Sequence, residues 1–457
     1  MGRVALVGDN TVEYISLLID IWNKGDCAVL LDWRMPFHAI LGMMREADAH
    51  ICYIENKFFA KFGDDLPQDI AFFPFESTIH IPCSLPDDVY RKFKSNYSTD
   101  EAVVIYSSGT TGKCKGVILS HYAININAEA IIDYMKPALD DCIYIAKTLS
   151  HASTLIGELL VALKSNMRLI IAPIIVPPRC ILNNIAKFKI TVICVNPTLL
   201  SMCSDEYEKQ RYDISSLRKI YVSGSILNDK IYNKAREIFG RIQIYNVYGL
   251  SEAGPRVTAQ RQGHCKNNSV GCPIKNVKVK IVDEYGESVS NGKMGIIHVQ
   301  TPCLFNGYIV GGNKCKSFCD GWLNTGDVGY FDDDEELHIV ARIDDVIVID
   351  SHKIYPNAVE RQVLMLDGIS ECVVIEGVFH NKKLLVCLYT GVQMDERKIR
   401  NKLVKCLPLY EIPKRFIFSN NIPRNTNGKI IKEEVCYLIK KRLELNENII
   451  FNEGKGL

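Results

Sequence analysis

The chain has 457 residues, with 54 lysines and arginines against 53 aspartates and glutamates. Its composition, 47% hydrophobic and 23% charged, is typical of a globular protein and excludes a disordered chain. The near-zero charge disfavours a general nucleic-acid binder, and no apolar run approaches the roughly 18 residues that span a membrane. We therefore expect two or three folding units, with no nucleic-acid partner and no membrane span.

The first ten residues, MGRVALVGDN, contain no apolar signal-peptide core and no cleavage site, so we expect no secretory leader. The 17 cysteines are scattered without a CxxC pair, which argues against a disulfide scaffold. We expect reduced, mostly buried thiols in a cytoplasmic protein. A metal site at Cys303, Cys315 and Cys319 is the alternative, although it lacks a second ligand pair.

Strands alternate with helices along the first hundred residues. Apolar runs at 3–7, 27–31 and 49–54 predict strands, and the apolar spacing over 15–22 predicts a helix between the first two. Pro36 can open a second helix at its first position. This alternation predicts a parallel sheet that is covered by helices on both faces.

The same unit recurs further along the chain. Residues 103–106 predict a strand, and residues 219–223, 229–239 and 242–247 predict a strand, a helix and a strand. The second unit therefore also favours a sheet with helical cover.

The pattern changes near residue 270. The period-two run at 277–283, the strand at 295–300 and further strands within 336–350 indicate a β-rich section. Helices near 358–366 and 396–406 then indicate a small α+β unit. The predicted fold class is α/β, with a large N-terminal domain of doubly wound α/β subdomains plus a β-rich subdomain, followed by a small α+β C-terminal domain.

The strand at 103–106 runs directly into the loop SSGTTGKCKG at 107–116. Its glycines let backbone N–H groups turn onto an anion, and its hydroxyls and lysines add donors and positive charge. The loop lacks the GxxxxGK[ST] spacing of a Walker A motif. We expect it to bind phosphate, the alternative being a polar surface loop.

The segment YSSGTTGKCKGV resembles the signature loop of the adenylate-forming (ANL) superfamily, which comprises acyl- and aryl-CoA synthetases, adenylation domains and luciferases. Further motifs follow in that family's order over essentially the whole chain. They are YVSGS (221–225), YGLSE (248–252), WLNTGD (322–327), ARIDD (341–345) and PRNTNGKI (423–430). The chain looks most similar to AMP-dependent acid–CoA ligases.

The resemblance implies ATP-dependent activation of a small carboxylic acid through an acyl-adenylate, followed by thioester formation with coenzyme A. It implies ATP and Mg²⁺ as cofactors of an AMP-forming acid–thiol ligase. One alternative acceptor is the phosphopantetheine thiol of a carrier protein. A luciferase-like oxidation ranks low. A catalytically idle nucleotide-binding homologue is the other class, and the retained Lys429, Asp327 and Glu252 argue against it.

The resemblance also implies two domains. Residues 1–343 would form the AMP-binding domain, which lacks some N-terminal family residues because the chain begins at the family's first RVAL strand. Residues 344–457 would form a mobile lid that carries Lys429 and rotates between the two steps. Asp344 matches the hinge.

The implied nucleotide site has three parts. The loop would hold the β- and γ-phosphates, residues 223–225 would lie along the adenine with Tyr248 stacked on it, and Asp327 and Arg342 would hold the ribose. The nucleotide-binding set is Ser107, Ser108, Gly109, Thr110, Thr111, Gly112, Lys113, Lys115, Ser223, Gly224, Ser225, Asn246, Tyr248, Gly249, Asp327 and Arg342.

The resemblance assigns four residues to catalysis. Ser251 would contact the α-phosphate, and Glu252 would hold Mg²⁺, a hard cation that prefers oxygen ligands. Lys429 would bridge the carboxylate and the α-phosphate and neutralise charge in the transition state. His151, in TLSHAST, would gate the carboxylate pocket, the alternative being a histidine that is packed in the core.

The acid is less readable. The stretch 148–154 has no carboxylate to pair an ammonium, so we expect a neutral aryl or aliphatic acid and not an amino acid. Arg256 is either a counter-charge for a second carboxylate or a surface residue. Ser351 stands where the family usually has glycine, and its side chain would narrow the path of the thiol.

Overall fold

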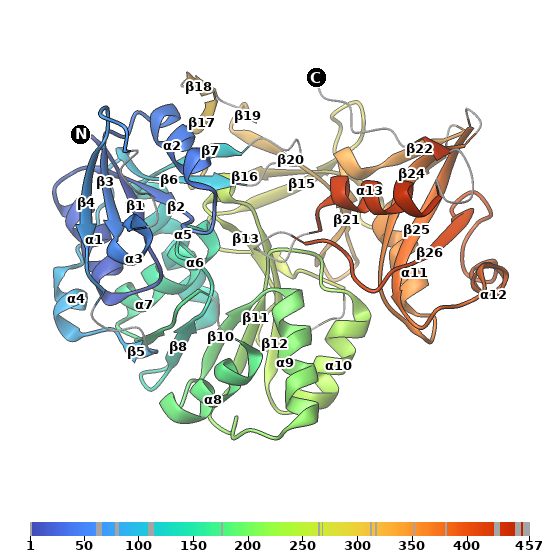
Figure 1. The fold of residues 1–457 in the computed structure, drawn as a ribbon, viewed down its shortest axis with the longest axis horizontal. Coiled ribbons are helices and arrows are strands. Elements are labelled where there is room, and N and C mark those ends of the chain that lie inside the picture. Colours follow the sequence, from blue (N-terminus) through green and yellow to red (C-terminus); the bar gives the residue numbers. More distant parts are fainter. Residues whose placement is uncertain are drawn as a thin grey trace.

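The computed structural model of the chain describes residues 2–60, 66–77, 82–107, 114–174, 177–263, 266, 268–310, 313–315, 318–350, 352–379, 382–424, 430–443 and 449–450. The predicted α/β class is confirmed (Figure 1). Among the described helices, none is both long and apolar enough to cross a membrane. The cysteines with described side chains are free thiols and most are buried, whereas the side chains of Cys315 and Cys319 lie outside the described part.

The first sheet has eight strands, of which five run parallel and three are added antiparallel at one edge. In spatial order they are β18 (Asn313–Cys315), β17 (Gly307–Val310), β7 (Lys115–Ser120), β6 (Glu101–Ser107), β2 (Cys27–Leu31), β1 (Arg3–Val7), β3 (Ile51–Glu55) and β4 (Ala71–Phe75). The antiparallel strands matter most here, because β6 and β7 flank the predicted phosphate loop.

Alternate residues of β1 enter two different cores, because successive side chains of a strand point to opposite faces. Leu6 packs in a core with α1 (Val12–Asn23), α4 (Asp87–Lys92) and α5 (His121–Met135). Ala5 and Val7 pack with α2 (Phe37–Glu46) and α3 (Asn56–Phe59). The predicted cover on both faces of this sheet is therefore confirmed.

The second sheet also has eight strands, with a parallel centre formed by β9, β8, β10, β11 and β12. In spatial order the strands are β14 (Cys272–Pro273), β13 (Arg256–Ala259), β12 (Gln243–Gly249), β11 (Lys219–Val222), β10 (Val192–Val195), β8 (Cys142–Ile145), β9 (Arg168–Ile171) and β5 (Cys83–Ser84).

One face of this second sheet is covered by α8 (Pro178–Phe188), α9 (Pro197–Lys209) and α10 (Asp229–Phe239) (Figure 1). The other face shares the large core that contains α5 and a continuous helical run. That run consists of α6 (Ala152–Thr154), the π-helical η1 (Leu155–Leu160) and α7 (Val161–Ser165). Because this core also contains residues of the first sheet, these helices lie between the two sheets.

A smaller antiparallel sheet forms the predicted β-rich section. It contains β15 (Lys278–Val282), β16 (Gly295–Gln300), β20 (Trp322–Phe331) and β19 (Phe318–Cys319), and β21 (Leu337–Arg342) pairs with β20. The register of β20 and β21 places Asp327 opposite Arg342. Two predicted ribose-binding residues are therefore neighbours across one antiparallel pair.

The C-terminal section forms its own hydrophobic clusters on both faces of β24 and β25, and it lies at one end of the molecule (Figure 1). Its elements are η3 (Ile343–Asp345), β22 (Ile347–Ile349), β23 (His352–Ile354), α11 (Pro356–Leu364), β24 (Ile369–Phe379), β25 (Lys382–Gly391), α12 (Glu396–Leu403), β26 (Arg415–Phe418), α13 (Lys432–Leu443) and β27 (Ile449–Ile450). The division at residues 343 and 344 stays a prediction.

Candidate active site

The predicted phosphate loop joins two paired strands, β6 and β7, whose register places Ser107 opposite Lys115. Ser108, Gly109, Thr110, Thr111, Gly112 and Lys113 lie outside the described residues. Lys115 is described, and its Nζ lies 5.3 Å from the ring centroid of Tyr308, within the range of a cation–π contact. The hairpin therefore fixes both ends of the loop, and an aromatic ring holds the lysine at its exit.

Glu252 lies in the short turn η2 (Ser251–Ala253) that follows β12. Its Oε1 accepts a 2.8 Å hydrogen bond from the hydroxyl of Tyr308 on β17, and its carbonyl accepts one from the Phe305 N–H at 3.0 Å. β17 in turn pairs with β7. One strand therefore links the exit of the phosphate loop to the predicted magnesium ligand.

The hydrogen bond between Tyr308 and Glu252 leaves one carboxylate oxygen available for a cation. Burial, followed by the negative charge of Glu252, raises the pKa of Tyr308, so the phenol keeps its proton and donates. Oε2 of Glu252 has no hydrogen bond to any described residue, which suits a hard divalent cation. The described part of the chain holds no group of three histidine, cysteine, aspartate or glutamate side chains that could bind a metal, so further oxygen ligands would come from phosphates and water.

Tyr248, Asp327 and Arg342 form one hydrogen-bonded group. The Tyr248 hydroxyl donates to Oδ2 of Asp327 at 2.5 Å, and Nη1 of Arg342 donates to Oδ1 at 3.1 Å. The same nitrogen also donates to the Thr325 carbonyl at 2.8 Å. Burial raises the pKa of Asp327, and the positive charge of Arg342 opposes that shift. An aromatic ring beside a buried carboxylate is suited to a flat base and the hydroxyls attached to it.

β11 and β12 run parallel and end at the same edge of the second sheet. Residues 223–225 follow the first strand and Tyr248 is the last residue but one of the second, so the two predicted adenine-binding segments are neighbours. Gly224 has a φ of 96°, which favours glycine. The Asn246 side chain donates to the Ser269 carbonyl at 3.0 Å, so in this structure it stabilises the strand. A nucleotide contact from Asn246 stays a prediction.

Gly249 is required by the close approach of two backbone segments. A Cβ placed on it would lie 1.9 Å from the Pro255 carbonyl oxygen, a distance that no side chain tolerates. The chain therefore folds back on itself directly after β12. That turn presents Ser251, half-buried, at the carboxyl edge of the sheet. Its predicted contact with the α-phosphate is not tested by this geometry.

His151 immediately precedes the helical run of α6, η1 and α7. It is half-buried, and its carbonyl accepts the N–H groups of Thr154 and Leu155. The run widens to π-helical geometry at η1, a feature that is common near functional sites. The predicted gate and the packed-histidine alternative both stay open.

Three charged side chains lie beside this helix, and two of them were missed by the sequence analysis. Glu158 in η1 is 1% exposed, and its Oε1 lies 2.8 Å from Nζ of Lys147. Arg256 is 5% exposed, so of its two alternatives the surface residue is wrong. A Cβ on Gly157 would lie 3.3 Å from Nη2 of Arg256, which places the guanidinium against the helix.

Asn127 on α5 holds the backbone of Arg256. Its Oδ1 accepts from the Arg256 N–H at 3.1 Å, and its Nδ2 donates to the Arg256 carbonyl at 2.9 Å. Asn127 is fully buried. The start of β13, which follows the turn that carries Ser251 and Glu252, is therefore tied to α5.

Three predicted residues belong to the C-terminal section, and two of them have no described position. Lys429 and Ser351 fall outside the described residues, so their roles stay predictions. Asp344, the predicted hinge, lies in η3, where its Oδ2 is 3.9 Å from Nη2 of Arg342. The predicted hinge residue thus contacts a predicted ribose-binding residue.

Tyr308 and Asn127 carried no signal in the sequence analysis. An aromatic residue in a strand and an asparagine on a helix are ordinary core and surface residues when only the local pattern is known. The motif that ends in Tyr308, FNGY, follows no polar loop and no charge cluster. Only the pairing of β17 with β7 brings Tyr308 to Glu252.

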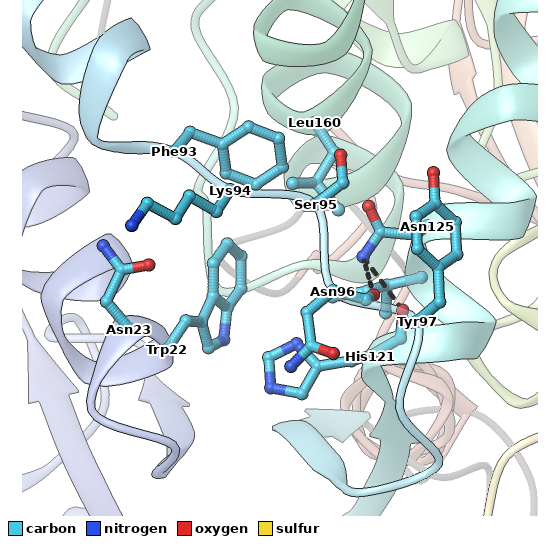
Figure 2. Close-up of a pocket in the computed structure, with 11 residues that line it drawn as sticks. Trp22, Asn23, Phe93, Lys94, Ser95, Asn96, Tyr97, His121, Asn125 and Leu160 are labelled. Atoms are coloured by element: carbon cyan, nitrogen blue, oxygen red, sulfur yellow. Dashed lines mark hydrogen bonds between the residues drawn. The ribbon is translucent and has the colours of Figure 1, made fainter.

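A separate hollow of about 270 Å³ lies between α1, the segment 93–97, α5 and the end of η1 (Figure 2). Figure 2 shows the rings of Trp22, Phe93 and His121 around it, with Asn125 bonded to neighbouring carbonyl oxygens. None of the predicted site residues lines this hollow. The candidate active site is therefore the sheet edge around Tyr248, Glu252 and Asp327.

Comparison with known proteins agrees with these motifs. A sequence profile described as "AMP-binding enzyme" matches residues 2–309. The 4-coumarate–CoA ligase of Pinus taeda is 29% identical over 94% of this chain and 84% of its own length. The fatty acid–[acyl-carrier-protein] ligase ScoC of Streptomyces coeruleorubidus is 26% identical over 95% of this chain and 86% of its own length.

The fold agrees as well. ATP-bound MatB from Rhodopseudomonas palustris superimposes with a TM-score of 0.85 at 22% identity, over 96% of this chain and 89% of that protein. At this identity the likeness establishes the shared fold. The resemblance drawn from the motifs is confirmed.

Proposed function

This chain belongs to the AMP-binding enzyme family, and we propose that it activates a small carboxylic acid with ATP and transfers the acyl group to a thiol. It is an AMP-forming acid–thiol ligase. The observation that carries the proposal is the meeting of two distant motifs, YGLSE (248–252) and WLNTGD (322–327). Tyr248 and Asp327 are joined by a hydrogen bond, and Glu252 follows Tyr248 by four residues on the same sheet edge.

Each part of ATP has a matching group. The buried carboxyl group of Asp327 accepts hydrogen bonds from the ribose hydroxyls, and the positive charge of Arg342 favours its ionised form against the effect of burial. Tyr248 places its ring against the base. Residues 223–225 lie along the other side of the adenine.

The phosphates lie toward the hairpin of β6 and β7. The loop 107–115 binds the β- and γ-phosphates through its backbone N–H groups and lysines, and Ser251 contacts the α-phosphate. Glu252 would hold Mg²⁺, and its orientation is set by the hydrogen bond from Tyr308. When bound, the cation would offset phosphate charge.

The first step joins the acid to AMP. A carboxylate oxygen attacks the α-phosphorus, the bond to the bridging oxygen of the β-phosphate breaks, and pyrophosphate leaves with that electron pair. Lys429 neutralises charge on the carboxylate and the α-phosphate as it develops. His151 closes the carboxylate end of the pocket.

The second step releases AMP. A thiolate attacks the acyl carbon, and the bond from that carbon to the adenylate oxygen breaks. Residues 344–457 form the lid that rotates at Asp344 between the steps, over the AMP-binding domain of residues 1–343. Coenzyme A is the proposed acceptor, and a carrier-protein phosphopantetheine is the second candidate. The similarity to an acyl-carrier-protein ligase supports this second candidate.

The experiment is ATP–pyrophosphate exchange with a panel of carboxylic acids, followed by thioester formation with coenzyme A against carrier proteins. We expect Mg²⁺-dependent exchange with at least one acid. Exchange with no acid would instead favour a catalytically idle nucleotide-binding protein, which equilibrium binding of ATP would then identify.

A further inference from the structure

Two distant segments meet at one buried group of charges beside the active site. The helix after His151 contributes Glu158, and the turn after Glu252 contributes Arg256. Lys147 completes the group. Glu158 and Arg256 are 1% and 5% exposed, and the Lys147 side chain is 16% exposed. Burial of charge is costly unless the charges are balanced by partners.

The balance within this group is incomplete. Lys147 lies 2.8 Å from Glu158 and accounts for its charge. Burial raises the pKa of Glu158, and the positive charges of Lys147 and, more weakly, Arg256 oppose that rise. The charged side chains that act on the pKa of the neighbouring Cys194 thiol are the same three. Two cations thus face one carboxylate among the described residues, which leaves a surplus of one positive charge.

Arg256 is held rigidly without a full set of partners. Asn127 binds both its backbone N–H and its carbonyl, and Gly157 leaves room for its guanidinium. Its Nε is buried without a hydrogen-bond partner among the described residues, and so is the hydroxyl of Tyr221. Burial raises the pKa of Tyr221, and the positive charge of Arg256 opposes that rise. The Nε–H of Arg256 and the hydroxyl of Tyr221 both lack an acceptor, and a carboxylate of a ligand could supply one to each.

We propose that Arg256 is a specificity-determining residue that binds a second anionic group of the acid, so that the substrate class is the dicarboxylic acids. The inference rests on the proposed function, because the first carboxylate must react at the nucleotide. The second carboxylate lies against Arg256 and accepts a hydrogen bond from Tyr221. Arginine is suited to this task because its planar fork matches a carboxylate. The earlier expectation of a neutral acid did not include these buried charges.

The position in the fold agrees with this role. Glu158 follows His151 by seven positions along the helical run, which corresponds to at most about 10 Å along the helix axis. His151 marks the end at which the reacting carboxylate is expected. We therefore place the far carboxylate of a medium-length acid at this charge group.

The test uses the full chain and matched acid pairs that differ by one carboxylate: butanoate with butanedioate, hexanoate with hexanedioate, and benzoate with terephthalate. ATP–pyrophosphate exchange gives kcat and KM for each acid. We expect the dicarboxylate of at least one pair to be preferred by about tenfold or more in kcat/KM. Arg256→Met should remove that preference through a higher KM for the dicarboxylate, while the monocarboxylate changes little.

Two further variants keep the proposal testable if Arg256→Met does not fold. Arg256→Lys keeps the buried positive charge but not the planar fork, and it should retain part of the preference. Tyr221→Phe should lower the preference severalfold without changing net charge. Arg241→Met, at an exposed position, is the matched control and should keep the wild-type ratio.

Monocarboxylates preferred in every pair, or an equal change for both members of each pair in Arg256→Met and Arg256→Lys, would overturn the proposal. Exchange with no acid at all would be a failure of the proposed function instead. Calorimetric titration with hexanedioate and terephthalate would then test the site separately from catalysis. Binding to the wild type that is lost in Arg256→Met and partly kept in Arg256→Lys supports the site, and binding that is absent from the wild type or unchanged in Arg256→Met refutes it.

Discussion

The hydroxyl of Tyr308 donates a 2.8 Å hydrogen bond to Oε1 of Glu252. This bond joins a strand of the first sheet to the turn at the edge of the second. We assign Tyr308 no contact with ATP or with the acid. We expect it to act through the Glu252 carboxylate that it orients.

Tyr308→Phe should weaken Mg²⁺ binding, because Glu252 loses the donor that sets its orientation. Partners of this kind contribute about 10–100-fold to metal affinity. The measurement is the Mg²⁺ concentration at half-maximal pyrophosphate exchange, which should rise while kcat recovers at saturating Mg²⁺. Tyr285→Phe, at an exposed position, is the control. An unchanged Mg²⁺ dependence would show that Tyr308 serves packing alone.

Lys429→Ala should lower the rate of ATP–pyrophosphate exchange by about 10²–10³-fold, because a preorganised cation is lost from the transition state. Thiolysis of supplied acyl-adenylate should survive, since that step forms no bond at the α-phosphorus. Lys441→Ala, at an exposed position, should leave both rates intact. Unimpaired exchange in Lys429→Ala would refute the assigned role.

Asp327→Asn should raise KM for ATP by about tenfold or more, because the amide cannot accept hydrogen bonds from Tyr248, Arg342 and a ribose as a carboxylate does. The KM for the acid should change little. Asp333→Asn, at an exposed position nearby, is the matched control. Equal effects on both substrates would point to a general loss of structure.

Asn127→Ala should reduce the free energy of unfolding by about 2–4 kcal/mol. It leaves the backbone N–H and carbonyl of Arg256 buried without partners, and each such loss costs about 1–3 kcal/mol. Urea denaturation measures the change, and Asn23→Ala at an exposed position should stay within about 0.5 kcal/mol of wild type. A similarly small effect for Asn127→Ala would contradict the importance of this contact.

Glu360 should make stability depend on pH. Burial raises its pKa from an ordinary value of 4.5 to about 7, while its Oε1 accepts from the Val374 N–H at 2.7 Å. Below pH 4.5 the carboxyl is protonated in both the folded and unfolded states. Between pH 4.5 and about 7 only the unfolded chain has lost the proton, so folding stability falls as pH rises.

Glu360→Gln keeps the acceptor oxygen without the charge. Its free energy of unfolding should therefore rise relative to that of the wild type as pH rises through this window. We expect a difference of about 1–2 kcal/mol, because the side chain is only partly buried and solvent screens its charge. Unfolding curves at pH 5, 6 and 8 measure the difference. A difference that is constant with pH would show that Glu360 titrates normally.

Local sequence determined much of this protein. The strands Arg3–Val7 and Cys27–Leu31 and the helix Asp229–Phe239 match their predicted bounds, because apolar periodicity and caps act over a few residues. Elsewhere the bounds shifted slightly, as at Ile51–Glu55. Thr11 caps the first helix, with its hydroxyl accepting a hydrogen bond from the Tyr14 N–H at 3.1 Å.

The family and the order of its motifs were also readable from sequence, because phosphate loops and acidic turns need particular residue types at particular spacings. The contacts between motifs were not. Tyr308 reaches Glu252 only through strand pairing, and Glu158 meets Arg256 only because a helix and a turn pack together. Such contacts join residues far apart in the chain, and their energies depend on burial and on partners that no local pattern contains. The tertiary structure therefore decided which charges balance one another, and that balance led to the inferred class of acid.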